Sequence, residues 1–139
     1  MLEISLTRKD AGCMPEKETE MIDAKEFVEM EDRARNAWID EHIMGFTVVP
    51  FSYDSSILVR LVKGRKFTIP PYHNRYDALR QLTDKMENLG YTWTVRYDFY
   101  THDFSVRRFG NDKVYQAGWW LPLELQIPLA IGRALGKIE

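Results

Sequence analysis

Three segments of the chain place apolar residues at spacings of three and four, the pattern of a helix that is buried along one side. They cover 24–44, 75–89 and 128–138. The middle segment has the clearest apolar stripe, formed by Tyr76, Leu79, Leu82, Met86 and Leu89. The pattern therefore predicts three helices.

Residues suited to helix ends flank these segments. We expect Asp23 to cap the first helix and Asn74 to cap the second, where Asp77 completes a short capping box. Gly90 is expected to end the second helix in a left-handed conformation. Pro128 is expected in the first turn of the last helix, where its missing N–H is not needed.

Between the helices the pattern changes to an alternation of apolar and polar residues, which is typical of strands. Residues 57–69 predict a hairpin with its turn in 63–66. Three further strands are expected at 93–98, 104–107 and 114–121. Because these strands have one apolar and one polar side, they predict an antiparallel meander with one face in water.

The predicted order is helix, strands, helix, three strands, helix. This order indicates an α+β fold in which an antiparallel β-sheet meander is sandwiched with α-helices. The length of 139 residues suits one domain. Residues 1–22 are polar and contain Gly12 and Pro15, so we expect a flexible N-terminal arm there and the single domain at 23–139.

Composition narrows the class of protein. A hydrophobic content of 45% is enough for a core that needs neither disulfides nor metal. Cys13 is the only cysteine and the three histidines stand far apart, so we expect no disulfide, no metal and no cofactor. No apolar stretch approaches the length of a membrane span and no signal-peptide pattern is present, which predicts a cytoplasmic protein without a membrane partner.

The net charge of −2 hides an uneven distribution. Residues 1–56 hold 13 acids and 6 bases, whereas 57–113 hold 11 bases and 6 acids. The overall pI of about 5.9 speaks against DNA as a partner. The basic middle segment favours a small anionic ligand, or else the two blocks neutralise each other within or between subunits.

Three strings of residues resemble the phage and prophage "ABA sandwich" small-protein family. They are Asp-Glu-His-Ile-Met-Gly-Phe at 40–46, Ile-Pro-Pro-Tyr at 69–72 before a helix, and Pro-Leu-Ala-Ile-Gly-Arg-Ala-Leu at 128–135. The resemblance covers about 40–138 and implies an ABA sandwich with an accessory function in phage biology, including evasion of host defence. Residues 47–68 look like an insertion relative to that family.

The chain departs from the family pattern at several positions. Phe46 stands where the family has Trp, and Gly132 replaces a small Cys. His73-Asn74-Arg75 stands where Ser-Thr-Asp is usual, so a base replaces an acid. This replacement makes the loop before the second helix a candidate for binding anions.

No pattern for catalysis stands out. The chain has no Gly-x-Ser-x-Gly elbow and no Gly-rich phosphate loop, and Cys13 lies in the predicted arm. Asp98 and Asp103 flank a predicted turn, but nothing singles them out as a catalytic pair. We therefore expect a non-enzymatic binding protein.

The start of the second predicted helix is the main candidate site. Its free backbone N–H groups and the helix dipole attract anions. Arg75 is unfavourable in a first turn unless an anion or a carboxylate lies nearby. Tyr72, His73 and Asn74 complete this candidate. Alternatively, Pro70-Pro71 is only a rigid entry to the helix and Tyr72 packs into the core.

Four further residues are candidates for ligand binding. Arg96 and Arg108 alternate with aromatic residues on the predicted sheet, unless that face is simply solvated. Arg133 reaches either a ligand or the acidic first helix. Trp119 and Trp120 are neighbours on a predicted strand, so they point to opposite faces, and one of them meets either a second subunit or the final helix.

Two hypotheses follow. The first is an anti-defence protein that sequesters a nucleotide second messenger between subunits of a homo-oligomer. Arg75, Arg108 and Arg133 would pair with its phosphates, and Tyr72 and Trp119 would stack on its bases. The alternative is a protein–protein interaction module that inhibits a host factor through the acidic first helix and an exposed aromatic residue.

Overall fold

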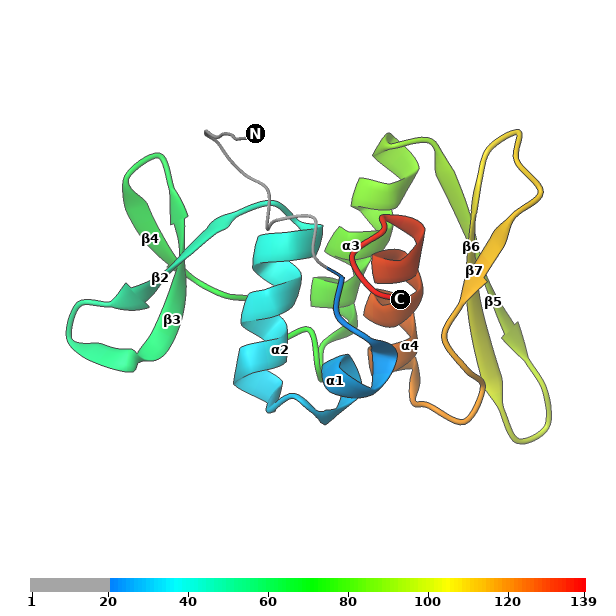
Figure 1. Cartoon of the computed structure of the whole chain (residues 1–139), viewed down its shortest axis with the longest axis horizontal. Coiled ribbons are helices and arrows are strands. Elements are labelled where there is room, and N and C mark those ends of the chain that lie inside the picture. Colours follow the sequence, from blue (N-terminus) through cyan, green and yellow to red (C-terminus); the bar gives the residue numbers. More distant parts are fainter. Residues whose placement is uncertain (1–20) are drawn as a thin grey trace, which may run out of the picture.

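The structure is a computed structural model that describes residues 21–139. Its elements in chain order are α1 (Ala24–Glu29), α2 (Asp32–Trp38), the π-helical turn η3 (Ile39–Ile43), β2 (Thr47–Phe51), β3 (Asp54–Val62), β4 (Arg65–Thr68), α3 (Tyr76–Asn88), β5 (Tyr91–Tyr97), β6 (His102–Arg108), β7 (Val114–Gln116) and α4 (Leu123–Ala134). The fold is α+β, as the sequence predicts, with antiparallel meanders packed against helices (Figure 1).

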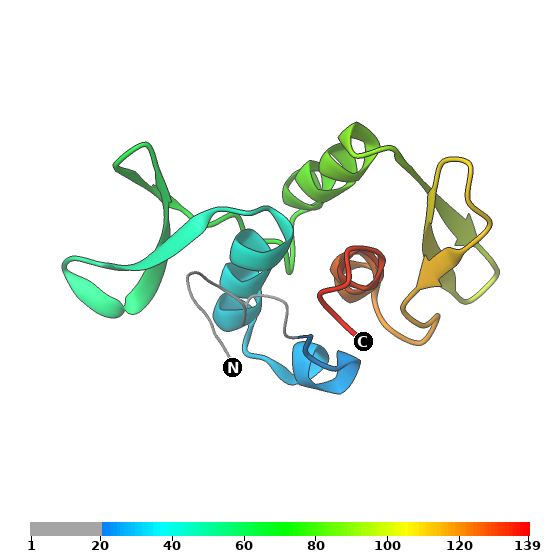
Figure 2. The same cartoon turned by 45° about the horizontal axis from the view of Figure 1, so that its top comes forward.

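Two separate three-stranded sheets flank the helices. The sheet β5-β6-β7 packs one face on α3 and α4. The sheet β2-β3-β4 is formed by the segment predicted as an insertion, and it projects from the opposite side of the helices (Figures 1 and 2). The hairpin predicted at 57–69 is confirmed as β3 and β4.

The core lies between the helices and the sheet β5-β6-β7. Its largest fully buried apolar side chains come from the helices, from strand β6 and from the loop before α3: Tyr72, Phe27, Phe104, Ile39, Leu79, Leu82, Met86, Leu129, Ile131 and Val106. The apolar stripe predicted for α3 supplies three of them. No helix within residues 21–139 is long and apolar enough to span a bilayer.

The single helix predicted at 24–44 is wrong, because the structure breaks it after α1. Met30 and Glu31 are both extended, with ψ of 146° and 148°. Arg35 is buried and donates to the carbonyl oxygens of Phe27, Val28 and Met30 at 2.6–3.1 Å. These bonds satisfy carbonyls that the break releases, so Arg35 stabilises the interrupted helix.

The third strand predicted at 114–121 is too long. β7 ends at Gln116. On the side of β6 that faces away from β5, Phe104 N–H and His102 C=O therefore have no neighbouring strand. The buried Gln126 of α4 replaces it, since its Oε1 accepts from Phe104 N at 2.9 Å and its Nε2 donates to His102 O at 3.0 Å. A helix side chain thereby continues the hydrogen bonding of the sheet.

The predicted helix ends are partly correct. Asp23 caps α1 by accepting from Glu26 N at 2.7 Å, and Gly90 follows α3 with φ of +92°. The N-cap of α3 is Arg75 rather than Asn74, because the turn through 72–74 delays the helix start by one residue. Pro128 lies inside α4 rather than in its first turn, since the buried Leu123 and Ile127 extend the apolar face toward the N-terminus.

Candidate functional site

Five aromatic side chains at one end of the molecule are 60–95% exposed. They are Tyr97, Phe99, Tyr100, Trp119 and Trp120, and we call this surface the aromatic end. Exposed clusters of large aromatic residues are uncommon on a monomer and mark interaction sites. The aromatic end is therefore the candidate functional site.

The turn between β5 and β6 exposes the first part of this surface. Asp98 N donates to Thr101 O at 3.0 Å and closes the turn, while Asp98 Oδ1 accepts from Phe99 N at 2.7 Å. Both bonds hold the backbone in a tight reversal. Phe99 and Tyr100 occupy its tip, where their rings are 94% and 95% exposed.

A second turn exposes the two tryptophans. Leu121 N donates to Gly118 O at 3.1 Å, which places Trp119 and Trp120 at the two corners of a β-turn. Their rings lie 6.0 Å apart, nearly perpendicular. The prediction that they stand on a strand and point to opposite faces is wrong, because β7 has already ended and both side chains at the turn corners are exposed.

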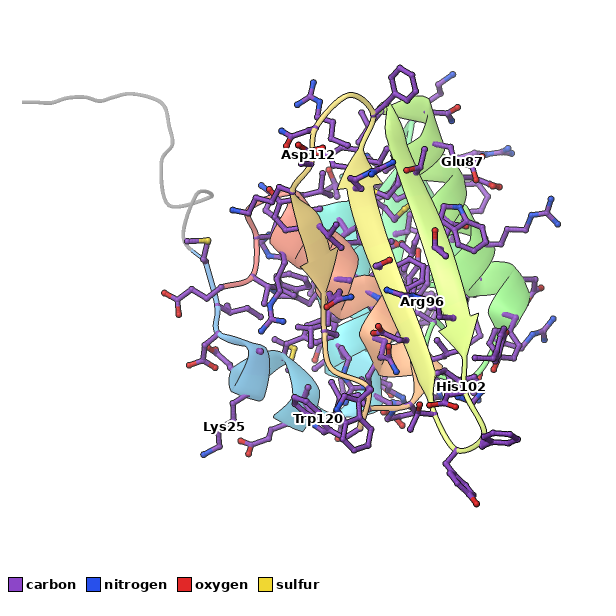
Figure 3. The ribbon with its side chains drawn as sticks, turned by 90° about the vertical axis from the view of Figure 1, so that its right-hand side faces the viewer. Lys25, Glu87, Arg96, His102, Asp112 and Trp120 are labelled. Atoms are coloured by element: carbon purple, nitrogen blue, oxygen red, sulfur yellow. The ribbon has the colours of Figure 1, made fainter. Side chains whose placement is uncertain are left out.

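A hollow of about 600 Å³ joins these two turns. Its lining combines two aromatic rings with charged and polar groups at the end of the sheet: Arg96, Tyr97, Asp98, Thr101, Asp103 and Trp119. Figure 3 shows Arg96 on the outer face of the sheet, with His102 and Trp120 toward the lower end. One cation beside two carboxylates makes this a polar hollow that carries both signs of charge.

Trp120 faces a neighbouring hollow of about 320 Å³ that is bounded by α1. Lys25, Val28 and Glu29 line its α1 side, and Arg133 lines the α4 side. The aromatic end is thus continuous with the charged first helix, the arrangement on which the protein–protein hypothesis depends.

Of the four predicted ligand-binding residues outside the loop before α3, the structure brings two together, Arg96 and Trp119 in the larger hollow. Arg108 lies at the opposite end of β6, with its guanidinium 5.9 Å from the Tyr91 ring. Arg133 donates to the carbonyl oxygens of Gln116 and Glu139 at 2.7 and 3.0 Å, so it joins chain segments to α4.

The loop before α3 has a structural role. Tyr72 is fully buried, so its ring cannot stack on a ligand, and the core alternative describes it correctly. His73 Nδ1 lies 2.9 Å from Asn36 Nδ2. Arg75 forms a two-bond ion pair with Asp77 at 3.0 Å, which supplies the carboxylate that a cation in this position requires. Asn74 remains exposed.

A buried ionic cluster that the sequence reasoning missed ties the second sheet to the body. Asp40 in η3 is 0% exposed. Arg60 of β3 donates to its two carboxylate oxygens at 2.9 and 2.6 Å, and the Tyr72 hydroxyl donates to it at 2.7 Å. The Phe46 ring covers the guanidinium at 3.8 Å. No local sequence signal reveals the cluster, because Arg60 and Tyr72 lie 20 and 32 residues from Asp40.

These contacts change the pKa values of Tyr72 and Arg60. Burial raises the pKa of the Tyr72 phenol above its ordinary value, and the hydrogen bond to Asp40 adds to the effect. The same carboxylate raises the pKa of Arg60 by hydrogen bonding to its charged form. The cluster joins η3, β3 and the loop before α3.

Within residues 21–139 no group of three or more His, Cys, Asp or Glu side chains is arranged to hold a metal ion. Cys13 lies outside the described residues. Compared with known protein families, curated proteins and solved structures, the chain matches none of them. The resemblance to the ABA sandwich family accordingly stays a prediction that rests on short strings.

Proposed function

We propose that this protein acts by binding another protein through the aromatic end. The exposure of five large aromatic side chains, four in two adjoining turns and Tyr97 at the end of β5, carries this proposal. Tyr and Trp are the residues that contribute most binding energy when a partner buries them. Here they stand on tight turns or at the end of a strand, so little backbone freedom is lost on binding.

The size of the aromatic end suits such a contact. Burial of five aromatic side chains at this exposure would remove roughly 600–900 Å² from water on this side. A stable interface buries about 800 Å² on each partner. Arg96, Asp98 and Asp103 beside the rings supply the polar rim that interfaces use for specificity.

The expected partner is a folded protein with apolar pockets that accept Trp and Phe rings. The resemblance to phage accessory proteins suggests a host factor, and binding would then block one of its surfaces. The same resemblance suggests the cytoplasm as the place of action. No step of this proposal requires catalysis or a cofactor.

Capture from a lysate of the producing cells tests the proposal. The bait is the full chain, compared with Trp119→Ala/Trp120→Ala and Phe99→Ala/Tyr100→Ala. Phe109→Ala and Tyr53→Ala are matched controls, because these rings are also 82% and 91% exposed but lie elsewhere. We expect one partner to be retained by the full chain and both controls and lost from both double variants. Equal retention by all baits would reject the aromatic end.

Nucleotide sequestration remains the second prediction. Its support is that Arg96 and Trp119 line one hollow. Native mass spectrometry after incubation with cyclic dinucleotides and cyclic ADP-ribose species tests it. We expect a retained ligand that Arg96→Ala loses, and no retention at micromolar protein would contradict it.

A further inference from the structure

Strand β5 lies at the edge of its sheet, and its hydrogen bonds show which backbone groups point away from β6. Gly90 O accepts from Phe109 N and Asp98 N donates to Thr101 O, so even-numbered residues of this strand bond toward β6. Backbone direction alternates along a strand. Tyr91, Trp93, Val95 and Tyr97 therefore direct their N–H and C=O groups away from the sheet.

This edge lacks the prolines, bulges, lysines and short length that the other edges carry. β2 has Pro50 and an irregular register beside it, β4 begins with Arg65 and Lys66, and β7 is only three residues long. Proline, bulges, lysines and short length all discourage strand addition. β5 has seven residues, with no proline, no glycine and no register shift.

We propose that two copies of this chain pair through β5, antiparallel and centred on Thr94. In this register Trp93 of one copy lies opposite Val95 of the other, and Tyr91 lies opposite Tyr97. All of these residues direct their backbone groups outward, so each finds a hydrogen-bonding counterpart. The result is a continuous six-stranded sheet with a two-fold axis.

The side chains of β5 fit this register. Trp93 opposite Val95 is an aromatic–β-branched pair, and Thr94 meets Thr94, both of which favour cross-strand pairing. Arg96 is the only charged residue of the strand and lies opposite Thr92, so no like charges face each other. A partner with the same sequence is thus complementary to the edge.

The charges on helix α3, which lies beside β5, are also complementary to those on a second copy of this helix. A groove of about 520 Å³ between α3 and β5 is rimmed by Arg80, Asp84 and Glu87 on the helix. None of the three has an ion-pair partner within residues 21–139. The two-fold axis makes the two copies of α3 antiparallel. Arg80 of each copy therefore approaches Asp84 and Glu87 of the other copy.

Charge reversal at the centre of the strand tests the pairing. Thr94 is exposed on the outer face, and its pair across the axis is one in which side chains approach closely. Thr94→Lys and Thr94→Glu each place like charges together and should weaken dimerisation by about fivefold or more. Mixing the two variants places Lys opposite Glu and should restore the dimer.

Ser105→Lys is the matched control, because Ser105 pairs with Thr94 within the sheet on the central strand. Analytical ultracentrifugation of the full chain and its variants gives the dissociation constants, and circular dichroism checks folding. We expect a dimer for the wild type, for Ser105→Lys and for the mixture. A monomeric wild type at ~100 µM, typical of weak association, overturns the proposal. A dimer that Thr94→Lys leaves unchanged also overturns it.

Discussion

Asp40 shows how one buried carboxylate can determine what its neighbours do. It has no exposure to solvent, so it needs partners for both oxygens. Arg60 and Tyr72 supply them from two segments distant in sequence. Tyr72 is thereby committed to the core, although the sequence made it equally suitable for stacking on a ligand.

Removal of the carboxylate should destabilise the fold strongly. Asp40→Ala leaves the Arg60 guanidinium largely buried without a counter-charge, which costs about 3–5 kcal/mol of unfolding free energy. Tyr72→Phe removes one hydrogen bond to a charged group and should cost about 2 kcal/mol. Urea unfolding measures both. Asp77→Ala, which breaks the exposed ion pair with Arg75, should change the midpoint far less.

Stability should also fall steeply at alkaline pH because of Tyr72. Its pKa is raised in the folded state above the ordinary 10.0. The stabilising effect of the protonated phenol is complete below pH 10 and is lost as pH rises toward the folded pKa. Above pH 10 the unfolding free energy should drop by an additional ~1.4 kcal/mol per pH unit.

Urea unfolding at several alkaline pH values measures this slope. Tyr72→Phe is the control, because it lacks the titrating group and should show a shallower slope. The same slope in both proteins would contradict the assignment.

At the element scale, agreement between sequence and structure depends on where the hydrogen-bond partners lie. The predicted helix 75–89 agrees with α3 to one residue, since its stripe and its terminal Gly90 are local signals. The helix at 24–44 and the strand at 114–121 disagree. Their ends depend on bonds from the Arg35 and Gln126 side chains to backbone groups, which no apolar–polar pattern reveals.

The same reasoning explains the candidate site. Sequence analysis singled out Arg96 and Trp119, which the structure places in one hollow. The sequence pattern placed Phe99 and Tyr100 among the aromatic residues that alternate with bases on the sheet, whereas the structure places both in the turn between β5 and β6. The turn predicted between Asp98 and Asp103 was the signal for this position.

Gln126 should be needed for the sheet as well as for α4. Gln126→Leu keeps the volume but leaves the buried Phe104 N–H without an acceptor, and it also frees the Leu121 carbonyl. We expect a loss of about 3 kcal/mol in unfolding free energy, measured by urea titration. Gln116→Leu on the exposed outer face is the control and should stay within ~0.5 kcal/mol. Equal losses of unfolding free energy in the two variants would show that Gln126 does not take the place of a neighbouring strand beside β6.

At the scale of the whole molecule, the two sheets differ in how they are held. The sheet β5-β6-β7 buries Phe104 and Val106 against α3 and α4. Val59 is the buried apolar residue of the sheet β2-β3-β4, which depends on the Asp40–Arg60 pair for its attachment. The second sheet should therefore open independently of the body.

Hydrogen exchange should reveal this difference. Amides of 47–68 are expected to exchange through local opening, with protection well below that of β5 and β6. Mass spectrometry of exchanged peptides resolves the two regions within one sample. Equal protection in both sheets would mean that the molecule unfolds as one unit.

The attachment of the second sheet through Asp40 has an evolutionary consequence. The sheet leaves the body after Phe46 and returns at Ile69, so it could be lost or acquired as one piece. A protein that lost the second sheet would retain the buried Asp40 without Arg60. Few proteins are stable enough to tolerate the resulting loss of unfolding free energy. Homologues without the sheet should therefore have an apolar or amide residue at the position of Asp40, and the acid and Arg60 should be inherited together.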